Sequence, residues 1–206
     1  RMFFARKGTK VNLVAGFPWF GRWGRDTFIS LPGLCIALND WRLFRLAIDT
    51  MLDDFKDGFF PNIGEGKQAA YNSVDAPLWF FWTLQQYAYI NDARKEVWQA
   101  YSHIMRNILE NFSEGVSNVR MDSNFLLWQG EEGKALTWMD AIIDGNPVTA
   151  RKGYAVEINA LWYNAVMFYR ELAKLQCEDG EIAKWDEFTA NFPTNFKATF
   201  WSKEIG

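Results

Sequence analysis

The sequence predicts an all-α fold in which three αα-hairpins each pair an inner helix with an outer one. Six stretches with apolar residues at helical spacing follow one another along the 206 residues. These stretches alternate between being apolar nearly all round and being apolar on one side only. Because a helix that is apolar all round is buried and a one-sided helix lies at the surface, this order predicts inner and outer helices in turn.

The expected inner helices cover residues 27–39, 74–90 and 156–175. The first two, TFISLPGLCIALN and VDAPLWFFWTLQQYAYI, are apolar on nearly every side. The third holds apolar residues at helical spacing, among them Leu161, Phe168 and Leu172, and has few charges before its end. All three are therefore predicted to be packed within the fold.

The expected outer helices cover residues 42–57, 94–112 and 181–202. Each has one apolar face, formed in the first of them by residues such as Phe44, Ile48 and Met51. Pro193 interrupts the third. Because proline lacks the backbone donor and clashes with the preceding turn, we expect the helix to break or kink there.

The connection from residue 113 to residue 155 is long and contains a predicted short β-hairpin near residues 116–128. Val119 and Met121 alternate with polar residues before a DSN turn, and an apolar stretch follows. A loop longer than ~12–15 residues inside a compact domain is usually functional. We therefore expect the remainder of this connection to contribute to a site.

Polar and glycine-rich clusters precede each expected inner helix. These clusters are FGRWGRD, EGKQAAYNSVD and RKGYAVEIN, whereas the connections from inner to outer helices are the plain NDWR, INDAR and CEDGE. If the inner helices run parallel, all three clusters meet at one end of the assembly. The N–H groups and positive dipole ends of the helices point into the same space there, which is the arrangement of a ligand site.

The high aromatic content has two explanations. Aromatic residues make up 17% of the chain, with 11 Trp and 18 Phe. Rings beside Gly, Asn and Asp offer stacking surfaces for the apolar faces of sugars, whereas the simpler alternative is a large helical core. The net charge of −3 argues against nucleic-acid and anionic-membrane partners. The longest apolar runs are far shorter than the ~20 residues of a membrane span.

The small number of histidines and cysteines limits the kinds of site that the chain can form. The one histidine, His103, and the two cysteines, Cys35 and Cys177, are widely separated, which argues against a transition-metal site or a histidine-based triad. We expect both thiols to be buried and reduced, the protein to be cytoplasmic, and no cofactor. Since the chain opens with Arg1 rather than Met, we also expect a piece of a longer polypeptide.

Four carboxylates lie in or near the polar clusters: Asp26, Asp75, Asp140 and Glu157. Asp26 and Asp75 have a simpler explanation as dipole-stabilising charges at helix N-termini, worth ~0.3–1 kcal/mol each. Asp140 caps no expected helix and follows Trp138, and partial desolvation beside an indole would raise its pKa and suit it to proton donation. Glu157 opens the third inner helix and either complements the dipole or accepts hydrogen bonds from sugar hydroxyls.

The dipeptide Arg25-Asp26 is a candidate for gripping vicinal hydroxyls, since it combines planar donors with a paired acceptor. The alternative is a local salt bridge. Asn72 and Asn159 add amide donors and acceptors in the same clusters. Three indoles in or beside the clusters are candidates for stacking against substrate: Trp19, Trp23 and Trp138.

Four motifs in a fixed order carry a family resemblance: AGFPWFGRWGRDTFISLPGL, YNSVDAPLWF, ALTWMDA and VEINALWYNA. Together they run from about residue 14 to residue 175, and the chain resembles the glucosidase domain of glycogen debranching enzymes, the amylo-α-1,6-glucosidases, in their bacterial and archaeal form. The resemblance implies an (α/α)6 toroid of inner and outer helices. Three hairpins are half of such a toroid, so residues 1–206 are expected to be a partial glucosidase domain.

The resemblance also implies a reaction. It implies inverting hydrolysis of the α-1,6-linked glucose at branch points of glycogen or another branched α-glucan. The family's general acid is an aspartate of the TWMD motif, matching Asp140, and the general base is expected from the missing C-terminal half of the domain. Arg25 and Asp26 resemble the pair that holds the non-reducing glucose in glucoamylase-type toroids. Four further residues match motif positions without an assigned role: Asn72, Asp75, Glu157 and Asn159.

Two alternatives remain beside this hypothesis. One is another toroid glycosidase, of glucoamylase or trehalase type, which would differ in substrate. The other is a non-catalytic glucan-binding helical domain, in which Asp140 would have no role in turnover. The first hypothesis requires Asp140 to lie on the same surface as Asp26.

Overall fold

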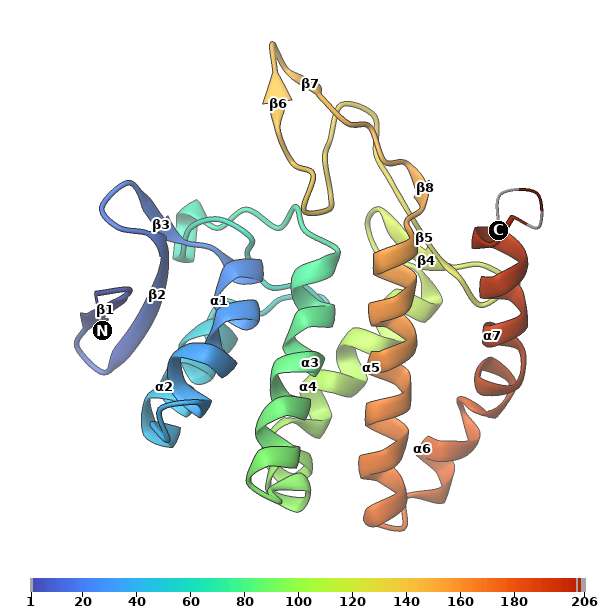
Figure 1. The fold of residues 1–206 in the computed structure, drawn as a ribbon, viewed down its shortest axis with the longest axis horizontal. Helices are drawn as coiled ribbons and strands as arrows, with labels where there is room; N and C mark the ends of the chain where they lie inside the picture. The colour runs from blue at the N-terminus through green and yellow to red at the C-terminus, as the bar shows by residue number, and fades with distance from the viewer. Residues whose placement is uncertain (1, 203, 205–206) are drawn as a thin grey trace.

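The computed structural model describes residues 2–202 and 204, and helices dominate it (Figure 1). The helices are α1 (Gly24–Leu31), α2 (Trp41–Leu52), α3 (Asp75–Ile90), α4 (Arg94–Glu114), α5 (Val156–Leu175), α6 (Asp179–Ala183) and α7 (Asp186–Phe200). The strands are β1 (Phe4–Lys7), β2 (Lys10–Gly16), β3 (Phe20–Arg22), β4 (Val119–Met121), β5 (Leu127–Gln129), β6 (Ile142–Ile143), β7 (Asn146–Pro147) and β8 (Gly153–Tyr154). The prediction of a mainly helical fold is confirmed, and the strands add small sheets to it.

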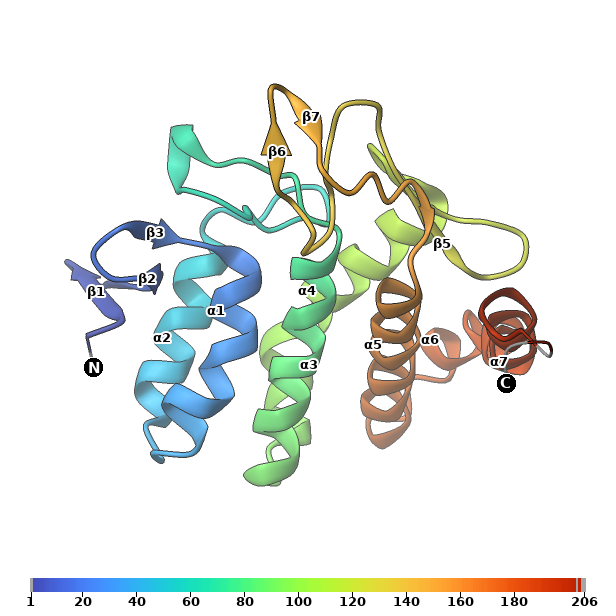
Figure 2. The same ribbon diagram turned by 45° about the horizontal axis from the view of Figure 1, so that its top comes forward.

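Helices α1, α3 and α5 lie side by side and run in the same direction, so that their N-termini share one end (Figures 1 and 2). Buried aromatic rings pack between the helices. Phe28 of α1 meets Phe80 of α3 with ring centroids 5.5 Å apart, and Phe112 of α4 lies 6.3 Å from Trp162 of α5. Full burial of a large apolar side chain stabilises the fold by about 1.5–3 kcal/mol. The shared core therefore keeps the N-termini of these helices together at one end.

The first inner helix begins earlier and ends earlier than predicted. It starts at Gly24 and gives way to a π-helical segment at Pro32–Ile36, where the N–H of Ala37 donates to the carbonyl of Pro32 at 3.0 Å. Pro32 has no N–H to donate to the preceding turn, and the wider π turn absorbs this interruption. The early start brings Arg25 and Asp26 into the first helical turn.

The prediction that the last helix breaks at Pro193 is wrong. Pro193 lies inside α7, and the interruption falls at Lys184 and Trp185, between α6 and α7. Trp185 is buried and meets Trp162 edge-on at 5.6 Å, so the chain turns where this indole enters the core. At Pro193 the neighbouring aromatic packing on α5 keeps the helix continuous despite the lost hydrogen bond.

An N-terminal sheet precedes the helices, and the sequence reading did not include it. Strands β1, β2 and β3 pair antiparallel in that order. Val11 and Leu13 of β2 are buried in the core, and the N–H of Val11 donates to Thr50 Oγ1 of α2 at 2.9 Å. The alternation of polar and apolar residues in KVNLV is the strand signal that marks this element.

The long connection between α4 and α5 folds into two small antiparallel sheets. Strands β4 and β5 pair where the sequence predicts a short hairpin, and β8 adds to β5. Strands β6 and β7 form a second hairpin that projects from the end where α1, α3 and α5 begin (Figure 2). Asp144 and Gly145, both with positive φ, make its turn, which is the turn chemistry of a tight hairpin.

The expectation of two buried thiols is right for one cysteine. Cys35 is buried in the core, whereas Cys177 is exposed in the turn after α5, where its φ is 59°. The apolar spacing of α5 ends before Cys177, which explains the error. Within residues 2–202 and 204, the helices fall short of the length and apolarity needed to cross a bilayer.

Candidate functional site

The guanidinium of Arg25 joins two helix N-termini to the long connection. Its Nε donates to Oδ2 of Asp75 at 2.6 Å and its Nη2 donates to Oδ1 of Asp75 at 3.1 Å. Its Nη1 donates to Oδ2 of Asp140 at 3.0 Å. Arg25 lies in the first turn of α1, Asp75 is the first residue of α3, and Asp140 comes from the loop before β6. The structure thus brings three predicted site residues together around one cation.

The start of α1 is fixed by a close approach of the backbone. The N–H of Gly24 donates to the carbonyl of Asn62 at 2.9 Å. A Cβ at Gly24 would lie 2.4 Å from the carbonyl oxygen of Pro61, so a side chain at this position would push α1 away. Glycine therefore lets α1 start close to residues 61 and 62 and places Arg25 facing α3.

The start of α3 is fixed by Ser73 and Asp75. Ser73 Oγ accepts from the N–H of Ala76 at 3.1 Å, as an N-terminal capping group does, and it also donates to Asp75. The side chain of Asp75 is 2% exposed, and its carboxylate is occupied by Arg25 and Ser73. Burial of the ion pair is tolerable because these partners satisfy its charges. Asp75 is thus buried and bonded to Arg25, and its expected role in substrate binding stays a prediction.

The contacts of Arg25 use all three guanidinium nitrogens, which bond Asp75 and Asp140. A guanidinium has five N–H donors, and these contacts use three of them. Arg25 thus organises the carboxylates around it, and two N–H donors remain for a ligand. Substrate binding by Arg25 and Asp26 stays a prediction.

Asp26 is a half-buried carboxylate with few partners. Within the described residues it forms no ion pair of the kind that holds Asp75 and Asp140. Burial raises the pKa of Asp26, and the nearby charges of Asp140 and Asp75 act in the same direction, while Arg25 acts against them. A carboxylate in this position can accept hydrogen bonds from an incoming ligand.

Asp140 and Trp138 are both accessible. The side chain of Asp140 is 28% exposed and is paired with Arg25, and Trp138 is 53% exposed. The sequence predicts that Trp138 partly desolvates Asp140, and the indole is also among the groups that lower the pKa of Glu157. Trp138 is thus placed beside the carboxylates with much of its surface free for a ligand.

A second guanidinium organises the start of α5. Arg151 donates through Nη2 to Oε2 of Glu157 at 2.7 Å and through Nη1 to Oε1 of the same residue. Its Nη1 also donates to Thr137 Oγ1 at 3.3 Å. Burial works to raise the pKa of Glu157, but hydrogen bonds from Arg151, from its own backbone and from Trp138 outweigh it and lower the pKa. The sequence reading did not single out Arg151, although it lies in the RKGYAVEIN cluster.

The group of residues around Arg25 and the group around Arg151 lie next to each other. The hydrogen bond to Glu157 raises the pKa of Arg151, and the charge of Asp75 adds to this effect. Arg25 contacts Asp140 and Arg151 contacts Thr137, so both guanidinium groups hold the same short segment, residues 137–140. The leading turns of α1, α3 and α5 therefore converge on this segment.

Asn159 and Asn72 differ in what they can reach. Asn159 is fully buried, accepts from the N–H of Leu127 at 2.7 Å and donates to the carbonyls of Leu127 and Ala155. These bonds tie α5 to β5, and the expected substrate-binding role of Asn159 stays a prediction. Asn72 is half-buried, and its Oδ1 has no hydrogen-bond partner within the described residues. That oxygen is itself buried.

Two of the predicted indoles lie at the N-terminal sheet. Trp19 is 84% exposed between β2 and β3. Trp23 is half-buried at the start of α1 and meets Phe20 edge-on at 6.2 Å. Trp23 directly precedes α1, and strand β3 lies at the end where α1 begins (Figure 2).

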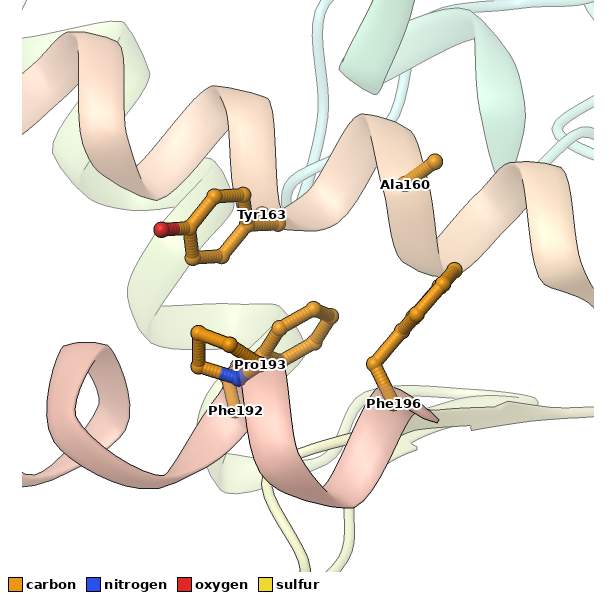
Figure 3. Close-up of a pocket in the computed structure, with 5 residues that line it drawn as sticks. All are labelled: Ala160, Tyr163, Phe192, Pro193 and Phe196. Carbon is orange, nitrogen blue, oxygen red and sulfur yellow. The ribbon is translucent and has the colours of Figure 1, made fainter. Parts of the chain in front are cut away.

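An apolar hollow lies elsewhere in the structure, between α5 and α7. Ala160 and Tyr163 of α5 face Phe192, Pro193 and Phe196 of α7 around a space of ≈ 310 Å³ (Figure 3). Its lining carries no carboxylate, whereas acid–base chemistry needs titratable groups at hydrogen-bond range. Composition and geometry therefore favour the carboxylate cluster as the candidate site.

Comparisons with known proteins agree on one family. The family described as amylo-alpha-1,6-glucosidase matches residues 2–206. The glycogen debranching enzyme of Saccharomyces cerevisiae (strain ATCC 204508 / S288c) is 24% identical over 262 residues, which cover 94% of this chain and 17% of the yeast protein. The chain thus spans less than a fifth of the length of this curated relative.

Proposed function

The chain belongs to the amylo-alpha-1,6-glucosidase family, and we propose on this basis that it carries part of a site that removes α-1,6-linked glucose from branch points of glycogen or a related α-glucan. The observation that supports this proposal best is the convergence of Arg25, Asp140 and Glu157 at the shared end of α1, α3 and α5. Exposed indoles beside these charges fit a ligand made of sugar rings.

In this proposal, Asp140 is the general acid. Its protonated carboxyl gives a proton to the leaving glycosidic oxygen as the bond to C1 breaks. A water on the opposite face of the sugar attacks C1 and loses a proton to a carboxylate base ~6.5–9.5 Å from the acid, which inverts the anomeric centre. We propose that the base comes from a part of the protein outside residues 1–206.

Arg25 sets the position of Asp140 before the substrate arrives. Its bidentate bond to Asp75 fixes the guanidinium, and the remaining nitrogen holds Asp140. For Asp140 to donate a proton, this contact has to weaken as the substrate binds. A sugar hydroxyl that bonds Arg25 Nη1 or Asp26 would achieve this.

The substrate-binding residues in the proposal are those with free polar or aromatic surface. Asp26 accepts hydrogen bonds from glucose hydroxyls, and Glu157 accepts at the edge of the site. The Oδ1 of Asn72 is buried and unpaired, so Asn72 contributes once its side chain turns toward the ligand. The proposed stacking surfaces are Trp19, Trp23 and Trp138.

We further propose that residues 1–206 form part of an (α/α)6 toroid, with α1, α3 and α5 as inner helices. The side-by-side arrangement of these helices and the return of the chain through α2 and α4 support this (Figure 1). The small share of the yeast relative that the chain covers supports a longer full-length protein. A cytoplasmic location and the absence of a cofactor stay predictions.

The test uses the full-length protein that contains this chain. We expect it to release glucose from panose or a branched limit dextrin and to act poorly on maltose and trehalose. The variant Asp140→Asn should lose turnover by about 10²–10⁴-fold, since general acid catalysis contributes this much, and should still bind the glucan. Asp144→Asn in the exposed β6–β7 turn is the matched control and should keep full activity.

Each alternative has its own outcome in the same experiment. Preferred hydrolysis of maltose or trehalose would indicate a glucoamylase-like or trehalase-like enzyme. Full turnover by Asp140→Asn would show that Asp140 is not the acid. Glucan binding without turnover by any variant, including the wild type, would indicate a binding domain.

A further inference from the structure

We propose that Arg151 is a positioning residue for the reaction: it holds the segment Thr137–Asp140 and Glu157 in the geometry in which Asp140 and Trp138 meet the substrate. This inference rests on the proposed function for the reaction that it serves. It concerns a residue with no role in the motifs that carry the family resemblance.

The contacts of Arg151 are those of a junction between three elements. Its guanidinium spans both carboxylate oxygens of Glu157 in the first turn of α5, and it also reaches the hydroxyl of Thr137 at 3.3 Å. Its own carbonyl accepts from the side-chain amide of Gln129 in β5. One residue therefore links α5, β5 and the segment that carries Asp140.

The backbone around Arg151 is held as firmly as its side chain. Gln129 is buried and pairs with Gly153 in the β5–β8 register, two residues after Arg151. The N–H of Val74 donates to the carbonyl of Leu136 at 2.9 Å, so the residue before Thr137 is tied to the start of α3. Arg151 therefore acts from the segment just before β8, which is bonded to β5, onto a segment that is anchored to α3.

The segment 137–140 is thus held at both ends by guanidinium groups. Arg151 bonds Thr137 at one end and Arg25 bonds Asp140 at the other. Trp138 lies in the sequence between these two bonded residues, and Arg151 also holds Glu157. If the Thr137 end is released, Asp140 keeps only the Arg25 contact, and a displacement of about 1 Å can cost ~10²-fold in rate.

Arginine suits this task better than lysine. Its planar fork places donors on both oxygens of Glu157 and still reaches Thr137, whereas a lysine ammonium is a single point of charge on a flexible stem. Lysine at this position would keep the charge opposite Glu157 and lose the link to Thr137. The two substitutions Arg151→Lys and Arg151→Met therefore separate charge from geometry.

The experiment compares three variants in the full-length protein: Arg151→Lys, Arg151→Met and the control Arg170→Met. Arg170 lies on α5 and, like Arg151, pairs with a carboxylate, Asp186 of α7, but away from the site. Two readouts are taken: kcat and KM for panose as functions of pH, and hydrogen exchange of the peptide that contains residues 137–140. The exchange readout does not depend on activity.

We expect Arg151→Met to lower kcat about 10–10²-fold with a smaller change in KM, to shift the acidic limb of the pH profile upward as Glu157 loses its partner, and to speed exchange in residues 137–140. Compared with Arg151→Met, Arg151→Lys should bring the pH profile back toward that of the wild type and recover less of the kcat. Arg170→Met should change neither readout.

Unchanged exchange in Arg151→Met would overturn the inference whatever the activity shows. Faster exchange with an unchanged kcat would overturn it as well, because the segment would then be held without any effect on the reaction. If the wild type itself fails to cleave panose, the proposed function fails. The positioning role in that reaction falls with it, and the exchange result then reports only a structural link.

Discussion

Arg25 and Asp75 are 50 residues apart in the sequence and form a bidentate ion pair across the first turns of α1 and α3, with Nε 2.6 Å from Oδ2. Both side chains are buried, and the same guanidinium reaches Asp140. The pair therefore serves two purposes. It locks two helix N-termini together, and it presents one free nitrogen to the residue that we propose as the acid.

The first prediction concerns this pair. Arg25→Met in the full-length protein should lower the free energy of unfolding around α3 by about 3–5 kcal/mol, because it leaves Asp75 charged, buried and unpaired. Hydrogen exchange of α3 amides measures this loss. The double variant Arg25→Met/Asp75→Leu should recover much of the stability and none of the activity. A single variant as stable as the wild type would show that the pair does not hold the helices together.

The apolar periodicity of the sequence predicts the long helices of this fold and misses its short strands. Apolar spacing identified the core face of α4, because a period near 3.6 repeats over many turns. The nearly continuous apolar sequence of α3 identified it as a buried helix. The β1–β3 sheet was missed because its strands bury only a few residues, such as Val11 and Leu13, which give a weak signal. The predicted break at Pro193 does not occur, because packing against α5 outweighs the local effect of the proline.

The candidate site shows the same division. The motifs pointed to Arg25, Asp26 and Asp140 and to their meeting at one end of the helices. They did not reveal which donors of Arg25 are engaged, that Asp75 is sealed from solvent, or that Arg151 reaches Thr137. These facts depend on side-chain geometry between segments far apart in sequence, which no local pattern encodes.

A second prediction concerns Asp26 and pH. Because burial raises its pKa above the ordinary 3.8, the folded state disfavours the charged form. Ionisation of Asp26 therefore costs stability at neutral pH, and this cost disappears as the pH falls through the raised pKa to the unfolded value. Asp26→Asn should raise the thermal midpoint of the domain at pH 7 and have little effect near pH 3.5, as melting curves across this range will show. An effect that grows toward acid pH would contradict the argument.

Glu157 should behave in the opposite way. Burial opposes its ionisation, but bonds from Arg151, its backbone and Trp138 lower its pKa below the ordinary 4.5. The charged form therefore stabilises the fold above the unfolded pKa, and this stability is lost as the pH falls through the lowered folded pKa. Glu157→Gln should lower the thermal midpoint at pH 7, and its deficit should shrink in acid. In the same buffers at pH 7, the melting temperature of Glu157→Gln should lie below that of the wild type, and that of Asp26→Asn should lie above it. Both differences should shrink in acid.

The last prediction tests the structural role of Asn159. Its side-chain amide accepts from the N–H of Leu127 and donates to the carbonyl of the same residue, which pairs both polar groups of one β5 residue with α5. Asn159→Ala would leave these buried groups unpaired, at a cost of about 1–3 kcal/mol in the free energy of unfolding. Hydrogen exchange at Leu127 should report the loss directly, since its amide would be released. The KM for panose at a temperature where the variant stays folded should match the wild type, because the amide does not reach the substrate. A raised KM with unchanged exchange at Leu127 would instead return Asn159 to the set of substrate-binding residues.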